Sequence, residues 1–187
     1  SLPGCAAIPA PHRDRGQIRR EIEARGLPVD ADAPYRLVVT RVADHEPMAH
    51  ELGQCLLYYI LENAHARHLF DREENARSIR RTDPNGLWYF TAANQAPDAL
   101  LRECCARVIE ACAESAKVKV TCCIGAPCAI EMLPDTLPTL QKLVERSVVF
   151  FGQAFTEDEA ITADEETQVL EIDKLKEMLL HYDKVSL

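Results

Sequence analysis

The sequence predicts an α+β fold, in which amphipathic helices cover a small sheet, and three observations predict it. Short β-branched runs alternate with helical segments in the order strand, helix, strand, strand, helix, strand, helix. Two of these runs flank Asp83-Pro84-Asn85-Gly86, whose residue types favour the turn of a β-hairpin. Apolar residues make up 47% and charged residues 27% of the 187 residues, as in a globular domain that builds its own core.

A helix over residues 14–26 is expected ahead of the main domain. Ile18 and Ile22 recur on one side of it, and Gly26 supplies a C-terminal stop. A linker rich in Pro, Asp and Ala follows, so residues 1–34 are predicted to form an N-terminal helix and linker.

The first strand is predicted over residues 35–43 (YRLVVTRVA), which are apolar and β-branched. Pro47 then opens a helix over residues 47–66. Its apolar side follows a 3.6-residue period through Leu52, Leu56, Tyr59, Ile60 and Asn63. The charged residues 67–75 are expected to form a loop.

A β-hairpin is predicted from residues 76–82 and 87–92, with the Pro-Asn-Gly turn between them. Trp88 and Phe90 alternate with Tyr89, so one set of rings should face the core.

Two further helices and a strand complete the main domain. Pro97 begins a helix over residues 97–115, with a continuous apolar stripe of Leu101, Cys105, Val108 and Cys112. A strand is predicted over residues 118–124, and one of its faces carries Val118, Val120, Cys122 and Ile124. A helix over residues 135–151 carries Leu137, Leu140, Val144 and Val148.

The C-terminal tail leaves two interpretations open, because residues 167–172 fit either an edge strand or the start of a helix. Asp173 is a good N-cap for a last helix, with an apolar side of Leu175, Met178, Leu179 and Tyr182. The main domain is expected over residues 35–160, and the tail with its helix over 161–187. The β-α-β-β-α-β order predicts a ferredoxin-like antiparallel sheet with helices packed on one face.

The charge balance and composition exclude several classes of protein. The net charge of −9 argues against a nucleic-acid surface, because phosphate binding needs a basic stripe. No run approaches the roughly 20 apolar residues that cross a bilayer, and no signal-peptide pattern opens the chain. The start at Ser1 without Met suggests an excised fragment. The eight cysteines read mostly as buried small apolar residues, which indicates a reducing cytoplasm.

Glu62, His65 and His68 recur every third residue on the long helix, a spacing that can hold a metal. A di-iron site needs a matching pair from another helix, and none is visible. We therefore expect an exposed polar helix face here, with no metal and no cofactor.

The cysteines leave a thiol or metal sensor as an alternative, through Cys104, Cys105, Cys112, Cys122, Cys123 and Cys128. No Cys-x-x-Cys spacing occurs among them, and free cysteine is most often a small buried hydrophobe. Cys123 faces away from the core valines in the predicted strand, so it is the thiol of most interest.

A candidate ligand pocket is formed by Arg41, Arg80, Trp88 and Tyr89, which the hairpin and first strand would bring together. The alternative for the two rings is plain cross-strand packing on the sheet. Nothing in the sequence favours a nucleophile or a phosphate loop.

The element order and hairpin resemble the palm-like fold of diguanylate cyclases, the GGDEF domains. Those enzymes carry metal-binding acidic residues at the end of the first strand and a Gly-Gly-Asp/Glu-Glu-Phe signature on the hairpin. Here Arg41 and Ala43 stand about where the acidic residues would be, and the hairpin signature is missing. Because two-metal phosphoryl chemistry needs carboxylates, the resemblance implies a domain that is not an enzyme.

Degenerate relatives of this domain, in AraC-type two-component response regulators, are similar over roughly residues 15–160. The matching stretches are Arg25-Gly26-Leu27-Pro28, Ile60-Leu61-Glu62-Asn63, Thr121-Cys122-Cys123-Ile124-Gly125, Leu133-Pro134 and Val149-Phe150-Phe151-Gly152. In the family this domain lies between a receiver and a DNA-binding helix-turn-helix.

The resemblance implies a non-catalytic, cytoplasmic coupling or sensing domain in signal transduction and transcription regulation. Its partners would be the receiver and helix-turn-helix domains of the same parent chain, together with a second copy in a homodimer. The fragment itself would contact neither nucleic acid nor membrane. The alternatives are a stand-alone small-molecule-binding domain and the thiol or metal sensor.

Overall fold

The computed structural model describes residues 15–27, 29–43, 45–70, 79–82, 88–94 and 96–185. It contains a five-stranded sheet with the strand order β2-β3-β1-β4-β5. The strands are β1 (Tyr35–Val42), β2 (Ile79–Thr82), β3 (Trp88–Asn94), β4 (Val120–Ile124) and β5 (Ala154–Thr156). Together with its helices this sheet confirms the α+β class.

The sheet is mixed, so the expectation of a wholly antiparallel sheet is wrong at one edge. β1 lies between β3 and β4 and is antiparallel to both, and β2 is antiparallel to β3. β5 runs parallel to β4. This three-residue strand had no sequence signal of its own, because so short a segment shows no alternation.

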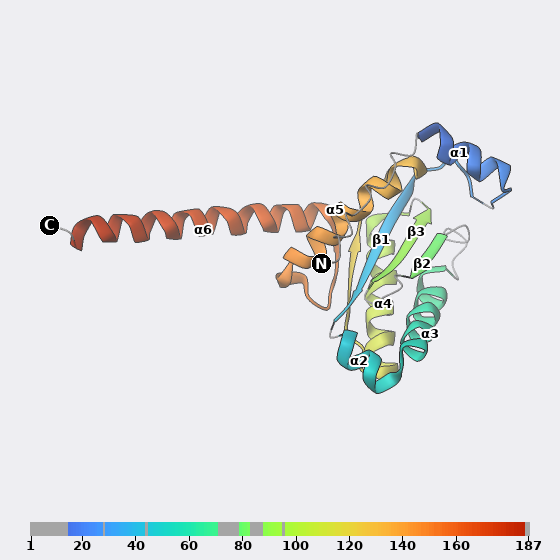
Figure 1. Cartoon of the computed structure of the whole chain (residues 1–187), viewed down its shortest axis with the longest axis horizontal. Coiled ribbons are helices and arrows are strands. Elements are labelled where there is room, and N and C mark those ends of the chain that lie inside the picture. The colour runs from blue at the N-terminus through green and yellow to red at the C-terminus, as the bar shows by residue number, and fades with distance from the viewer. Residues whose placement is uncertain are drawn as a thin grey trace, which may run out of the picture.

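Helices cover both faces of the sheet, with α3 and α4 on one face and α5 on the other (Figure 1). The α-helices are α1 (Arg15–Ala24), α2 (His45–Leu52), α3 (Gln54–His65), α4 (Asp98–Ala116), α5 (Leu133–Arg146) and α6 (Glu157–Val185). The prediction of helices on one face is therefore wrong. Every residue of β4 is buried, and such a strand needs an apolar layer on each side.

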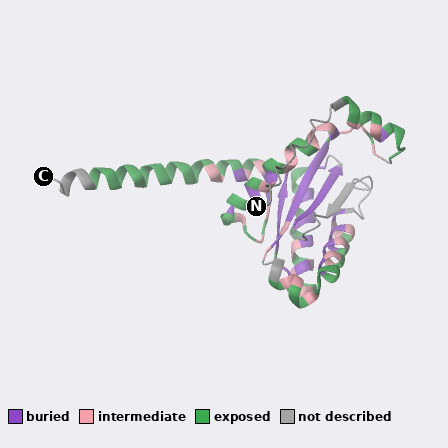
Figure 2. Cartoon of the chain, in the orientation of Figure 1, coloured by how far each residue is buried: buried purple, intermediate pink, exposed green. Residues whose placement is uncertain are grey.

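The two faces of the sheet carry separate apolar clusters. Leu37, Val39 and Phe90 pack under α5 against Leu140 and Val144. The opposite face packs against α3 and α4, through Val42, Leu57, Leu61, Tyr89, Val108, Cys112 and Val120. The predicted stripe of α4 is confirmed, because Leu101, Cys105, Val108 and Cys112 are all buried. In Figure 2 the strands β1, β3 and β4 are coloured mostly as buried.

The helix predicted over residues 47–66 is two helices, α2 and α3, separated by Gly53. Gly53 has a φ of 78°, a left-handed conformation that interrupts the helix and that glycine adopts at little cost. The break turns a different side of α3 inward. Leu56 and Tyr59 are 46% and 66% exposed, whereas Leu57, Leu61, Ala64 and His65 are buried.

After α3 the helix continues as a π-helical turn, Ala66–Phe70, where a loop was expected from residue 67. The strands of the hairpin are confirmed by the β2–β3 pairing, in which Arg80 lies opposite Thr91. The predicted turn, residues 83–86, lies outside the described residues.

The helix predicted to end at residue 151 ends at Arg146, and a 3-10 turn, Val148–Phe150, follows it. Val148 is consequently 76% exposed, although the helical period would have placed it inside. Residues 167–172 are helical and belong to α6, which begins earlier than expected, at Glu157. A strand interpretation of this segment is thereby excluded.

Candidate functional site

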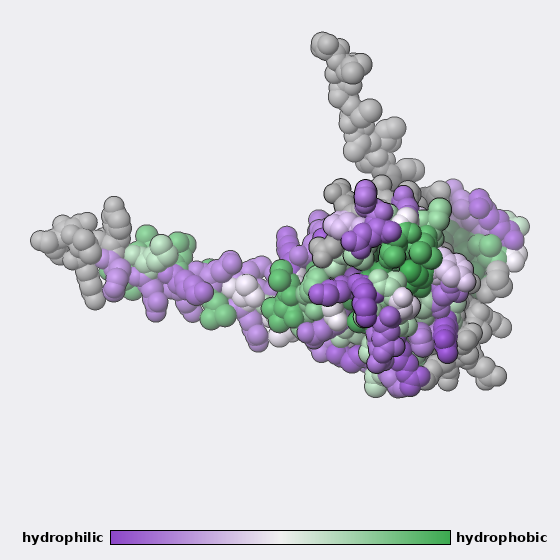
Figure 3. Space-filling view, turned by 90° about the horizontal axis from the view of Figure 1, so that it is seen from below, coloured by the Kyte–Doolittle hydropathy of each residue, from purple (hydrophilic) through white to green (hydrophobic). Residues whose placement is uncertain are grey.

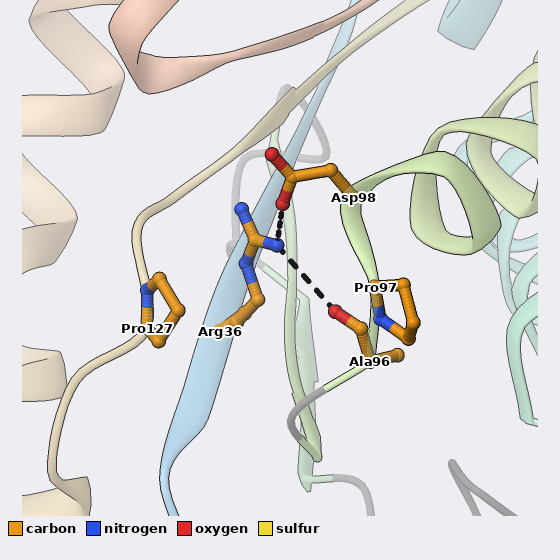
Figure 4. Close-up of a pocket in the computed structure, with 5 residues that line it drawn as sticks. All are labelled: Arg36, Ala96, Pro97, Asp98 and Pro127. Atoms are coloured by element: carbon orange, nitrogen blue, oxygen red, sulfur yellow. Dashed lines mark hydrogen bonds and ion pairs between the residues drawn. The ribbon is translucent and has the colours of Figure 1, made fainter.

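A pocket of about 370 Å³ lies where the first residues of β1 meet the start of α4 (Figure 4). Its lining is Arg36, Ala96, Pro97, Asp98 and Pro127. β1 contributes the arginine, and the segment that enters α4 contributes the next three residues. Pro127 comes from the loop after β4, so three elements distant in sequence meet here.

Arg36 is the buried charge of this pocket, with only 4% of its surface exposed. Its Nε donates to the carbonyl oxygen of Gly125 at 2.9 Å, and its Nη1 donates to that of Ala96 at 3.5 Å. Nη1 also forms an ion pair with Asp98, whose side chain is 63% exposed. The carboxylate side of this pair therefore faces water, whereas the guanidinium side is enclosed.

Sequence reasoning missed Arg36, although one signal was present. It is a charged residue inside an otherwise apolar strand, and a buried charge needs partners. Those partners could not be identified from the sequence, because Ala96 and Asp98 lie 60 and 62 residues further along the chain.

The structure brings together part of the predicted pocket of Arg41, Arg80, Trp88 and Tyr89. Arg41 and Trp88 are paired across β1 and β3, and the guanidinium carbon lies 5.5 Å from the centre of the indole ring. Tyr89 lies on the opposite face of the sheet, where its hydroxyl donates to Glu62 at 2.6 Å. The side chain of Arg80 lies outside the described residues.

A chain of hydrogen bonds connects the sheet to α3 in the interior, on the face that carries Tyr89. Thr40 Oγ1 lies 2.9 Å from His65 Nε2 and 3.4 Å from Cys122 Sγ. His65 Nδ1 lies 2.7 Å from the carbonyl oxygen of Leu61, which can only accept. In the neutral ring Nδ1 therefore carries the proton, and Nε2 accepts from the Thr40 hydroxyl.

The prediction of an exposed polar face at Glu62, His65 and His68 is wrong for His65, which is only 1% exposed. The ring lies against that of Tyr89, tilted by 31° with centroids 4.0 Å apart, and its hydrogen bonds compensate for burial. Within the described ranges, no group of three metal-capable side chains lies close enough to hold an ion.

Two cysteines of the interior, Cys105 and Cys122, form a hydrogen bond with each other, and further buried thiols lie nearby. The hydrogen bond between Cys105 and Cys122 lowers the pKa of Cys122, against the opposing effect of burial. The same Cys105–Cys122 bond, followed by burial, raises the pKa of Cys105. Burial raises the pKa of Cys112 to about 12.

Cys123, the thiol of most interest from the sequence, faces the opposite way from Cys122 as predicted, but α5 covers that face and Cys123 is fully buried. Burial raises its pKa, so it stays protonated at neutral pH. These thiols pack as apolar groups, and their burial limits access for an oxidant or a metal.

The α6 helix is a second candidate functional surface, because most of its length extends away from the domain (Figure 1). Apolar and hydrophilic surface alternate along this projecting segment in Figure 3. Eight large apolar side chains of α6 are exposed by 39% to 69%: Ile161, Val169, Leu170, Ile172, Leu175, Met178, Leu179 and Leu180. None of the helices in the described part of the chain has the length and apolar character to cross a bilayer.

Comparison with known proteins gives no assignment. No family model matches the chain, and no curated protein matches it. What the chain does must therefore be argued from the pocket at Arg36 and from α6.

Proposed function

We propose that this chain is a non-catalytic coupling domain of a bacterial transcriptional response regulator of the AraC type. In this proposal it relays the state of a receiver domain to a DNA-binding domain of the same cytoplasmic parent protein. The observation that carries the proposal is the construction of α6. Its first two turns are fixed in the fold, and the rest projects from it.

The root of α6 contacts three parts of the domain. Ala160 is fully buried under α5. Glu159 pairs with Arg102 of α4 at 2.8 Å, and Glu157 accepts from the backbone N–H of Ala126 at 2.9 Å. A rearrangement of either helical layer or of the loop after β4 would therefore change the direction of α6.

The length of α6 makes such a change large at its far end. A helix of 29 residues is about 43 Å long at a rise of about 1.5 Å per residue. A tilt of about 5° at the root would move the far end by about 4 Å, which is of the size of known switching movements at interfaces. A domain attached there would be displaced by the same amount.

The strand order supports the degenerate-cyclase part of the proposal. Four neighbouring strands, β2-β3-β1-β4, are antiparallel throughout, which is the arrangement expected for a ferredoxin-like or GGDEF-like core. Arg41 lies over the Trp88 ring near the end of β1, where the enzymes hold metal. A fixed positive charge at that place is consistent with a domain that does not cyclise nucleotides.

The proposal is tested first by the coding sequence on both sides of the chain. A receiver before it and a helix-turn-helix after it are expected. The absence of both domains would refute the assignment. Incubation with GTP and Mg²⁺ should give no cyclic dinucleotide, and measurable turnover would refute the non-catalytic part.

The relay itself is tested in the full regulator by Arg102→Ala. Loss of its pair with Glu159 should weaken the dependence of operator binding on receiver phosphorylation, with basal operator binding retained. Arg107→Ala is the matched control, because Arg107 lies on the same helix but pairs with Glu103 one turn away. Equal behaviour of the two variants would argue against a relay through the root of α6.

A second candidate function, sensing of a small anion, is favoured by the pocket at Arg36. Thermal-shift measurements with small carboxylates and phosphate esters test it, since a bound ligand raises the melting temperature. Asp98→Asn removes the competing carboxylate and should enlarge the shift, whereas Arg36→Lys should reduce it, because a single ammonium cannot bind a carboxylate bidentately. If neither the wild type nor the Asp98→Asn variant shows a shift in melting temperature, this function is excluded for the anions tested.

A further inference from the structure

Four of the eight exposed apolar side chains of α6 form a stripe with the spacing of a coiled-coil seam. Ile172, Leu175 and Leu179 lie at intervals of three and four residues, and Ile161 continues the same pattern eleven residues earlier. Alternating intervals of three and four keep side chains on one side of a helix that wraps around a second helix. We refer to these four residues as the α6 stripe.

The α6 stripe lies on a different side of the helix from the side that contacts the domain. At about 100° per residue, the stripe lies about a quarter turn around the helix from the docked side. That docked side is marked by Ala160, which is fully buried, and by Asp164, which pairs with Arg146 at 3.8 Å. A second helix can therefore lie along the stripe with the contacts of the root retained.

A depression of about 280 Å³ lies on the stripe, lined by Gln168, Glu171, Ile172 and Leu175. These four residues have the spacing i, i+3, i+4 and i+7. Four residues in this arrangement form the hole that receives one side chain from a facing helix in knobs-into-holes packing. Ile172 is one of the four residues that form this hole. In a symmetric parallel pair, the side chain that enters it is therefore Ile172 of the second copy.

We propose that α6 forms a parallel, two-stranded coiled coil with α6 of a second copy of this chain, in register at Ile172. A β-branched residue at Ile172 and a leucine at Leu175 occupy the two alternating seam positions, a combination that favours parallel dimers. Two-fold symmetry then places each Ile172 in the hole of the other copy.

Charge complementarity supports the parallel orientation. Glu171 and Lys176 are the residues that flank the seam on its two sides, five positions apart. Within one helix this separation keeps them apart, since side chains meet at three or four residues. In a parallel pair, Glu171 of each copy faces Lys176 of the other, which gives two ion pairs by symmetry. In an antiparallel pair they would lie on opposite sides of the interface.

The seam is apolar mainly in its C-terminal part, because Glu165 and Gln168 occupy two seam positions nearer the domain. Three consecutive apolar positions from each helix predict a dimer of modest affinity, with a Kd on the order of micromolar or tens of micromolar. The proposal goes beyond the relay, which requires no second copy.

Sedimentation velocity of the full chain, from roughly 1 to 200 µM, tests the pairing. A dimer that dissociates on dilution is expected. Leu175→Asp should weaken it by about a hundredfold or more, because the pair would bury two carboxylates. Leu180→Asp is the matched control, because Leu180 is equally apolar and exposed but lies on the other side of α6. It should change the Kd by less than about threefold.

Circular dichroism of both variants establishes that α6 remains helical, so that loss of the dimer is not loss of the helix. A wild-type chain that stays monomeric over the whole range would overturn the proposal. An equal effect of the two substitutions would also overturn it, since the contact would then not follow the stripe.

The parallel register is tested by exchanging charges. Glu171→Lys and Lys176→Glu alone should each weaken the dimer by about five- to tenfold, because each places like charges opposite one another. The double variant should recover to within about threefold of wild type. Failure to recover overturns the parallel register. A monomer, by contrast, would leave the relay standing, since the relay depends on the Arg102→Ala experiment in the full regulator.

Discussion

The hydroxyls of Thr40 and Thr91 provide a test in which one substitution has opposite effects in neighbouring strands. Both residues are buried, Thr40 in β1 and Thr91 in β3. Thr40 contacts His65 and Cys122 through its oxygen. Thr91 Oγ1 has no hydrogen-bond partner among the described residues. Valine has nearly the same shape and the same preference for strands, so replacement isolates the hydroxyl.

Thr40→Val should lower the free energy of unfolding by about 2 kcal/mol. The nitrogen of His65 that accepts from Thr40 would be left unsatisfied in the interior, which costs about 1–3 kcal/mol. The weaker bond to the Cys122 sulfur is lost as well. No cavity forms, so the loss reports the hydrogen bonds alone. Against a typical stability of about 5–15 kcal/mol, this change is easily measured.

Thr91→Val should instead raise the free energy of unfolding, by about 1 kcal/mol or more, because a buried hydroxyl without a partner is penalised. Urea unfolding followed by circular dichroism, at one fixed protein concentration, measures both effects. A stabilised Thr40→Val, or two substitutions with the same sign and size, would refute the assignment of the hydrogen-bonded chain from β1 to α3.

Three further predictions concern other parts of the fold. Gly125→Ala should destabilise the protein by about 1–3 kcal/mol in urea unfolding, because its Cβ would lie 2.9 Å from the Leu140 side chain and 3.1 Å from a backbone oxygen. Arg36→Met should cost about 2–4 kcal/mol by leaving two carbonyls without their charged donor. Asp98→Ala should cost a comparable amount, because the buried guanidinium of Arg36 would lose its counter-charge. Burial opposes ionisation of Glu159, but the hydrogen bond with Arg102, assisted by bonds with Thr156, lowers its pKa overall. The contribution of ionised Glu159 to stability is therefore complete above the ordinary carboxyl pKa and is lost as pH falls through the lowered folded value. Thermal unfolding of Glu159→Gln should therefore depend less on pH below about pH 5 than that of the wild type.

Local periodicity predicted the helices best where one helix ran without interruption. The apolar stripe of α4 was fully predictable, because 19 consecutive helical residues keep one side inward. The side of α3 was predicted wrongly, because Gly53 restarts the helix and rotates the side that faces the sheet. A single glycine in an otherwise helical pattern does not by itself reveal that the helix ends there.

The candidate site was less predictable than the fold, because its contacts join distant parts of the chain. The partners of Arg36 and Thr40 come from other elements, and no local pattern identifies them. The proposed pocket at Trp88 and Tyr89 combined neighbours that a strand places on opposite faces. The same alternation could have separated them from sequence alone. The exposure of the apolar residues of α6 was equally hidden, since periodicity shows an apolar side but not whether the domain covers it.

The shortness of β5 has a consequence for how copies of this chain would meet in the proposed dimer. An exposed edge strand offers unpaired backbone groups on which another chain can add a strand, a route to aggregation. β5 provides only three residues before the chain turns into α6, so a template on this side of the sheet is brief. In the proposed dimer, approach of two copies along α6 would therefore bring together side chains rather than open backbone, which favours a reversible association over the growth of a continuous sheet.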